Sequence, residues 1–136
     1  MTDKMKVYAK VTRSLKKMLP TVPQNQVVVL AMLVAGIVSG RNAQLSEIGL
    51  HVPSTTAKPD SLAKRFQRFV KNERVIKEAL FLPFAETLLA HLADKRLFVT
   101  MDASQVGRGC MTLMVAVIYR QRALPLVWSI WYCCYC

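Results

Sequence analysis

Hydrophobic and polar positions follow a helical period over the first two thirds of the chain. Residues 4–19 carry apolar side chains three and four positions apart, with lysine and arginine between them, which predicts an amphipathic helix. Pro20 and Pro23 interrupt this pattern, since proline disfavours helix continuation. Residues 24–38 are apolar almost all round, so we expect a second helix that is buried among others and ends at Gly40.

Two shorter helices are predicted next. The first covers residues 43–50, and a turn around Pro53 separates it from the second, which either Asp60 or Ser61 caps. A short helix, a turn and a basic helix form the outline of a helix-turn-helix unit. The positions expected to face inward are Leu45, Ile48 and Leu50 in the first helix and Leu62, Phe66, Phe69 and Val70 in the second.

In the last third of the chain, the spacing of apolar residues changes from a helical to a strand-like pattern. Residues 73–93 still read as helical, with Pro83 expected to kink the segment or to start a new helix. The runs LFVTM, MTLMVAVIY and LPLVWSIWY are rich in β-branched and aromatic residues, and QVGRG and RQRA between them suit tight connections. These runs predict an antiparallel meander, with Asp102 at the end of its first strand. The fold class is therefore α+β, with a helical module at residues 1–96 and strands at residues 97–129.

Charge distinguishes the two modules. The chain has 136 residues and a formal net charge of +11, and only three of its nineteen Lys and Arg residues lie after residue 96. Such an excess favours polyanionic partners, nucleic acid first and an anionic membrane surface second. The candidate DNA contacts lie off the apolar stripe of the second short helix and are Lys64, Arg65, Arg68 and Lys71.

Two features bear on the cellular compartment. Residues 27–40 form an apolar run, but a transmembrane helix needs roughly 20 residues and shorter runs are typical of buried helices. Three of the four cysteines crowd into residues 133–136, which is not the spacing of a disulfide framework or of a zinc site. We therefore expect a core helix, reduced thiols and a cytoplasmic protein.

Four stretches carry a family resemblance: LSEIGLHVPS, SLAKRFQRFVKN, LFVTMDASQVG and LMVAVIYRQRALPLVW. Over most of residues 24–129 the chain resembles insertion-sequence transposases of the DDE class, whose catalytic domain has an RNase H-like fold. The resemblance implies that residues 97–129 are the first three strands of that fold and that Asp102 is the first catalytic acid and a metal ligand. It also implies that the helical module binds element DNA and that Mg²⁺ or Mn²⁺ is the cofactor.

The later acids of the family are missing from this sequence. Residues 103–136 contain no Asp and no Glu, whereas the family uses three carboxylates to hold two metal ions. We therefore expect a truncated transposase fragment that is catalytically incomplete, with residues 130–136 as an aberrant cysteine-rich tail. Without the remaining strands and helices, the sheet is expected to have an open edge and an uncovered apolar face.

Two alternative functions stay open. The chain can instead be a regulatory DNA-binding protein that inhibits full-length transposase by occupying element ends or forming mixed oligomers. It can also be a small membrane-associated protein that uses residues 27–40, although a membrane is the less favoured partner. The expected partners are DNA at element ends and either full-length transposase or a second copy, with no small-molecule substrate.

Overall fold

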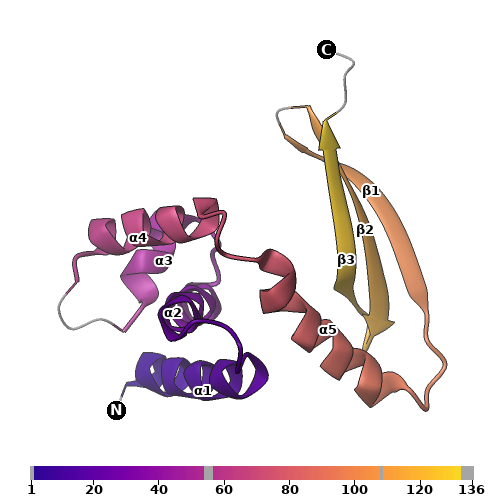
Figure 1. Cartoon of the computed structure of the whole chain (residues 1–136), viewed down its shortest axis with the longest axis horizontal. Helices are drawn as coiled ribbons and strands as arrows, with labels where there is room; N and C mark the ends of the chain where they lie inside the picture. Colours follow the sequence, from indigo (N-terminus) through magenta and orange to yellow (C-terminus); the bar gives the residue numbers. More distant parts are fainter. Residues whose placement is uncertain (1, 54–56, 108, 133–136) are drawn as a thin grey trace. The chain divides into compact units, whose positions relative to one another are not determined.

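The computed structural model describes residues 2–53, 57–107 and 109–132. Within them, helices come first and strands follow (Figure 1), as the α+β prediction requires. The elements are α1 (Asp3–Met18), α2 (Gln24–Gly40), α3 (Leu45–His51), α4 (Pro59–Lys71), α5 (Lys77–Leu92), β1 (Val99–Gly107), β2 (Cys110–Tyr119) and β3 (Arg122–Tyr132).

The chain divides into two compact units within α5. The boundary lies between Phe81 and Leu82, so one unit is Met1–Phe81 and the other is Leu82–Cys136. The change from helix to strand comes later, between Leu92 and Val99. The last turns of α5 therefore group with the sheet, whereas the predicted division placed them with the helical module.

α2 is the central helix of the first unit, and α1, α3 and α4 pack against it. Its apolar sequence predicted burial on nearly every side, and this is confirmed in part, since Ile37 and Val38 near its end are 38% and 56% exposed. Buried residues occur along most of its length, at Val27, Val29, Ala31, Leu33, Ala35 and Gly36.

α2 ends at Gly40, as predicted, but glycine is not the left-handed residue that terminates the helix. Gly40 is the last helical residue, and the left-handed residue that follows it is Arg41, with φ of 52°. The Arg41 N–H donates to the Ile37 carbonyl oxygen at 2.7 Å, which closes the last turn. Gly40 has a different role, because a β-carbon built there would lie 2.5 Å from Cδ2 of His51. Glycine at this position makes room for a side chain of α3.

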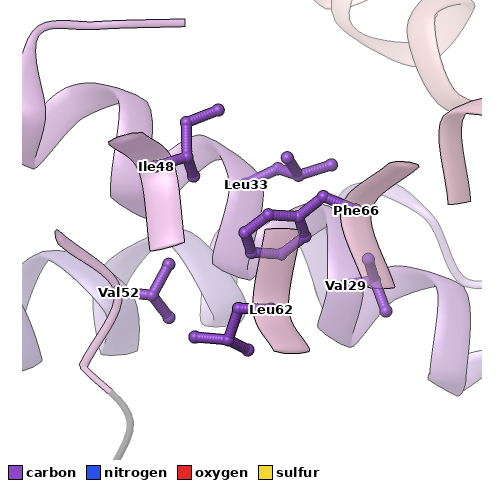
Figure 2. Packing of buried hydrophobic residues seen from close by; sticks show 6 residues of the cluster. All are labelled: Val29, Leu33, Ile48, Val52, Leu62 and Phe66. Atoms are coloured by element: carbon purple, nitrogen blue, oxygen red, sulfur yellow. The ribbon is translucent and has the colours of Figure 1, made fainter. Parts of the chain in front are cut away.

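The hydrophobic core of this unit joins α2, α3 and α4 (Figure 2). Phe66 of α4 is fully buried and Ile48 of α3 is 1% exposed. Burying a side chain of this size contributes about 1.5–3 kcal/mol, so the cluster anchors α3 and α4 on α2. Its members are Val29, Leu33, Ile48, Val52, Leu62 and Phe66.

Two of the positions predicted to face inward are wrong. Leu50 is 54% exposed and Val70 is 52% exposed. At about 100° per residue, Leu50 lies roughly 200° from the buried Ile48, so its side chain is rotated out of the core. Val70 lies about 40° from Phe66 on the same side of α4, but it is one turn beyond Phe66 at the end of the helix and is exposed there. The other predicted positions lie in the core or against it, at Leu45, Ile48, Leu62, Phe66 and Phe69.

α4 begins before the residues predicted to cap it. Lys58 precedes the helix, and its carbonyl oxygen accepts hydrogen bonds from the N–H groups of Ser61 and Leu62 at 3.0 and 3.1 Å. Pro59 is the first helical residue, a position that suits proline because its N–H would have no helical partner. Asp60 and Ser61 therefore lie in the first turn.

The strands form the predicted antiparallel meander, in the order β1-β2-β3. Arg120 and Gln121 connect β2 to β3, and both have positive φ, 48° and 63°. A two-residue connection with positive φ at both positions matches the twist of the strands that it joins. β3 ends at Tyr132, where the predicted run LPLVWSIWY ends. Residues 130–132, which the predicted domain division assigned to a tail, pair with residues 110–112 of β2. Residues 133–136, with the other three cysteines, lie outside the described residues.

The sheet exposes many apolar side chains, as predicted for a sheet without covering elements. β1 and β3 each pair with β2 alone among the described strands, so both are edge strands. Large apolar residues that are more than a third exposed occur on all three strands, at Val99, Met101, Val106, Ile118, Val127, Trp128, Ile130, Trp131 and Tyr132.

Candidate nucleic-acid interface

α4 presents a basic face to solvent. Its opposite side is held in the core by Leu62 and Phe66. At about 100° per residue, the four basic residues predicted to contact DNA fall within an arc of about 120° that avoids this buried side. All four are exposed: Lys64, Arg65, Arg68 and Lys71. The structure therefore brings the predicted residues together on one surface, which we call the α4 face.

None of the four basic residues of the α4 face forms an ion pair within the described part of the chain. The ion pair present in that part joins Lys6 Nζ to Asp3 Oδ1 of α1 at 3.3 Å. Nε of Arg68 donates to the Lys64 carbonyl oxygen at 3.4 Å, which occupies one of the five N–H donors of its guanidinium. Asp60, in the first turn of α4, lies four residues before Lys64 on the same side of the helix, but forms no ion pair with it. Four exposed cations against this one acid leave a net positive potential that attracts phosphate groups and weakens as salt increases.

A shallow hollow adjoins the α4 face near the beginning of the helix. Ala57, Ser61, Leu62, Arg65 and Arg68 line it. The hollow therefore combines a hydroxyl group with two guanidinium groups, which are suitable donors for phosphate oxygens. Ser61 was predicted only as a cap. Its spacing of four and seven residues from the two arginines was the signal that it shares their face.

α3 and α4 resemble the two helices of a helix-turn-helix unit, with a longer link. The link covers residues 52–58, of which residues 54–56 lie outside the described part, and a typical turn has three or four residues. The helices nevertheless approach closely, because a β-carbon built at Gly49 of α3 would lie 2.8 Å from the Pro59 carbonyl oxygen. α4 occupies the place of the second helix, which enters the major groove in such units.

Asp102 does not lie at the end of its strand. It is the fourth of the nine residues of β1 and pairs with Met114 of β2. The residues after it lack large apolar side chains until Val106, so the sequence pattern suggested a turn, but backbone pairing with β2 continues the strand. The Asp102 side chain is exposed, and the Ser104 hydroxyl donates to its Oδ2 at 3.4 Å.

The described residues do not form a metal site around Asp102. They contain no group of three or more His, Cys, Asp or Glu side chains that is placed to hold a metal ion. Asp102 is also the only Asp or Glu in residues 97–132. A two-metal centre for phosphoryl transfer needs several carboxylates, so these residues do not fit one, and no catalytic step can be derived from Asp102 alone.

Comparisons with known proteins give no relative, since no family model, curated protein or solved structure matches the chain. The apolar run that suggested a membrane alternative corresponds to α2. No single helix of the described residues is long and apolar enough to cross a membrane, although α2 and α3, which are bent by 86° relative to each other, pass that test as a pair.

Proposed function

We propose that the chain binds duplex DNA through the α4 face and is related to DDE transposases. The α4 face carries this proposal: four exposed basic residues share one side of a helix whose other side is anchored in a core, with no acid paired to them among the described residues. A helix that is anchored in a core and presents four cations, free of ion pairs in the described part of the chain, suits a groove lined by phosphates.

The two kinds of basic residue have different roles in this proposal. Lys64 and Lys71 act as point charges toward phosphates and contribute affinity without sequence preference. Arg65 and Arg68 present planar guanidinium groups, which can form two hydrogen bonds with O6 and N7 of guanine in the major groove. Ser61 supplies a further donor to phosphate beside them.

The transposase resemblance supplies the proposed class of DNA, the ends of a mobile element. In this view residues 97–129 correspond to the first strands of an RNase H-like domain and Asp102 to the first catalytic acid. Metal-dependent cleavage with Mg²⁺ or Mn²⁺ would require acids beyond those that the described strands supply.

One observation favours a second, regulatory role. The α4 face is assembled, whereas the acids needed for cleavage are not present together in the described residues. A chain that occupies element ends without cutting them would compete with a complete transposase for those ends. Mixed oligomers with that enzyme are a second route to the same inhibition.

DNA binding is tested with the double variant Arg65→Gln/Arg68→Gln and a fluorescent duplex whose anisotropy is followed at several salt concentrations. We expect an affinity loss of about tenfold or more and a shallower slope of log affinity against log salt, because two cations that face the DNA are lost. The matched control, Arg74→Gln/Lys77→Gln, removes two exposed cations outside the α4 face and should change little. Equal effects of the two variants would contradict the proposal.

A further inference from the structure

α1 carries a second basic surface. Its five basic residues in the middle and last turns fall within an arc of about 120°, and all are exposed: Lys6, Lys10, Arg13, Lys16 and Lys17. Asp3 is the only acid of α1, and it pairs with Lys6. The other four cations have no ion-pair partner among the described residues. We call this surface the α1 face.

The α1 face and the α4 face lie on opposite sides of α2. Val29 and Leu33 of α2 contribute to the core shared with α3 and α4. Val27 and Ala31 lie roughly half a turn away from them and are also buried, and α1 is the other helix that packs on α2. Figure 1 shows α1 and α4 on either side of α2. The axes of packed helices are about 8–10 Å apart, so the axes of α1 and α4, with α2 between them, are about 16–20 Å apart.

The buried side of α1 indicates which polyanion the α1 face suits. A helix that binds a lipid surface inserts an exposed apolar side into it. In α1 that side is used for packing, since Leu15 and the adjacent Leu19 are 4% and 2% exposed, and Met5 is the one large apolar residue of the helix that is well exposed. A shallow hollow lined by Met5, Tyr8, Ala9, Thr12, Arg13 and Lys16 is the apolar surface left open beside the α1 face. Five exposed cations next to so short an apolar surface suit the phosphate backbone of a nucleic acid.

We propose that the α1 face is a second DNA-binding surface, so that one helical unit holds two duplex segments on opposite sides of α2. This inference rests on the proposed DNA binding by α4. Four of the five cations of the α1 face are lysines, which contact phosphates as point charges on flexible stems. The α1 face therefore binds without sequence preference, whereas the α4 face also contains two arginines suited to bases.

A bridging assay tests the second surface. A biotinylated duplex is fixed on beads, the full chain is added, and capture of a second, fluorescent duplex is measured. The variant Lys10→Gln/Arg13→Gln/Lys17→Gln should reduce this capture about tenfold and keep most binding to the first duplex. The control Arg74→Gln/Lys77→Gln/Lys95→Gln removes the same charge from exposed positions outside both faces and should retain capture.

Other outcomes separate this inference from the proposed function. Sedimentation velocity should find complexes of one chain with two duplexes, and complexes with one chain for each duplex would overturn the proposal. Unchanged capture by the α1 variant would also overturn it. If the α1 variant loses binding to phosphatidylserine vesicles but still captures the second duplex, the α1 face binds lipid instead of DNA, and the proposal is overturned as well. If Arg65→Gln/Arg68→Gln leaves binding to the first duplex unchanged, the α4 proposal fails, while the α1 variant still reports on the α1 face.

Discussion

Gly49 of α3 lies against Pro59, the first residue of α4: a β-carbon built at Gly49 would be 2.8 Å from the Pro59 carbonyl oxygen. A backbone oxygen cannot move aside as the tip of a flexible side chain can. Glycine therefore allows α3 to approach the beginning of α4, and this contact helps to set the position of the α4 face relative to the core.

The first prediction follows from this contact. Gly49→Ala should lower the free energy of unfolding by about 1–3 kcal/mol, because the added methyl group forces the helices apart. Alanine is the better helix former by about 1 kcal/mol, so helix propensity alone predicts the opposite sign. Urea denaturation followed by circular dichroism measures the change. Leu50→Ala, at the exposed neighbouring position, is the control and should cost about 0.5 kcal/mol or less.

The core prediction concerns Phe66, which is fully buried. Phe66→Ala should cost about 3–5 kcal/mol, since it removes a large side chain from the contact of α4 with α2 and α3. The control is Val70→Ala, on the same helix but 52% exposed, which should cost much less. Similar unfolding midpoints for the two variants would show that the cluster in Figure 2 does not hold α4.

The lysines of the α4 face should act differently from its arginines. Lys64→Gln/Lys71→Gln should weaken binding by a similar factor for duplexes of different sequence, because phosphate contacts carry no base information. Arg65→Gln/Arg68→Gln should in addition reduce the preference between sequences. Competition between labelled and unlabelled duplexes measures both effects. A change of sequence preference in the lysine variant would reverse the proposed assignment of roles.

Asp102→Asn should leave DNA affinity within about twofold of the original chain, with or without Mg²⁺, because one carboxylate without partners is a weak metal site. The purified chain should not cleave duplex DNA in Mg²⁺ or Mn²⁺. Gel electrophoresis of an end-labelled duplex tests this. Metal-dependent cleavage that Asp102→Asn abolishes would mean that acids from elsewhere complete the site.

The exposed sheet should cause self-association. Ile130→Lys replaces an apolar side chain of the edge strand β3 that is 58% exposed, and should reduce aggregation as measured by static light scattering. Ser129→Lys, on the same strand and also exposed, adds the same charge without removing apolar surface. A larger effect of Ile130→Lys would identify apolar exposure as the cause, and equal effects would identify charge.

Local patterns predicted much of the fold, because helical periodicity and proline positions are properties of neighbouring residues. The clustering of Lys64 and Arg68 on one face follows from their spacing alone. The middle position of Asp102 could not be predicted in this way, since pairing with a distant strand decides where β1 ends. The close approach of Gly49 to Pro59 likewise depends on how two helices pack.

The register shift of β3 has a consequence for how the sheet can be shielded. Residues opposite each other in an antiparallel pair share a face, and Val115 pairs with Val127 while Ala116 pairs with Pro125, so Leu126 is an inserted residue. Beyond it, Trp128 lies opposite Met114 and Trp131 opposite Met111, which places the two indole rings on different faces. A layer packed on one face would bury one tryptophan and leave the other exposed to solvent. Complete burial of both therefore requires packing on both faces of the sheet.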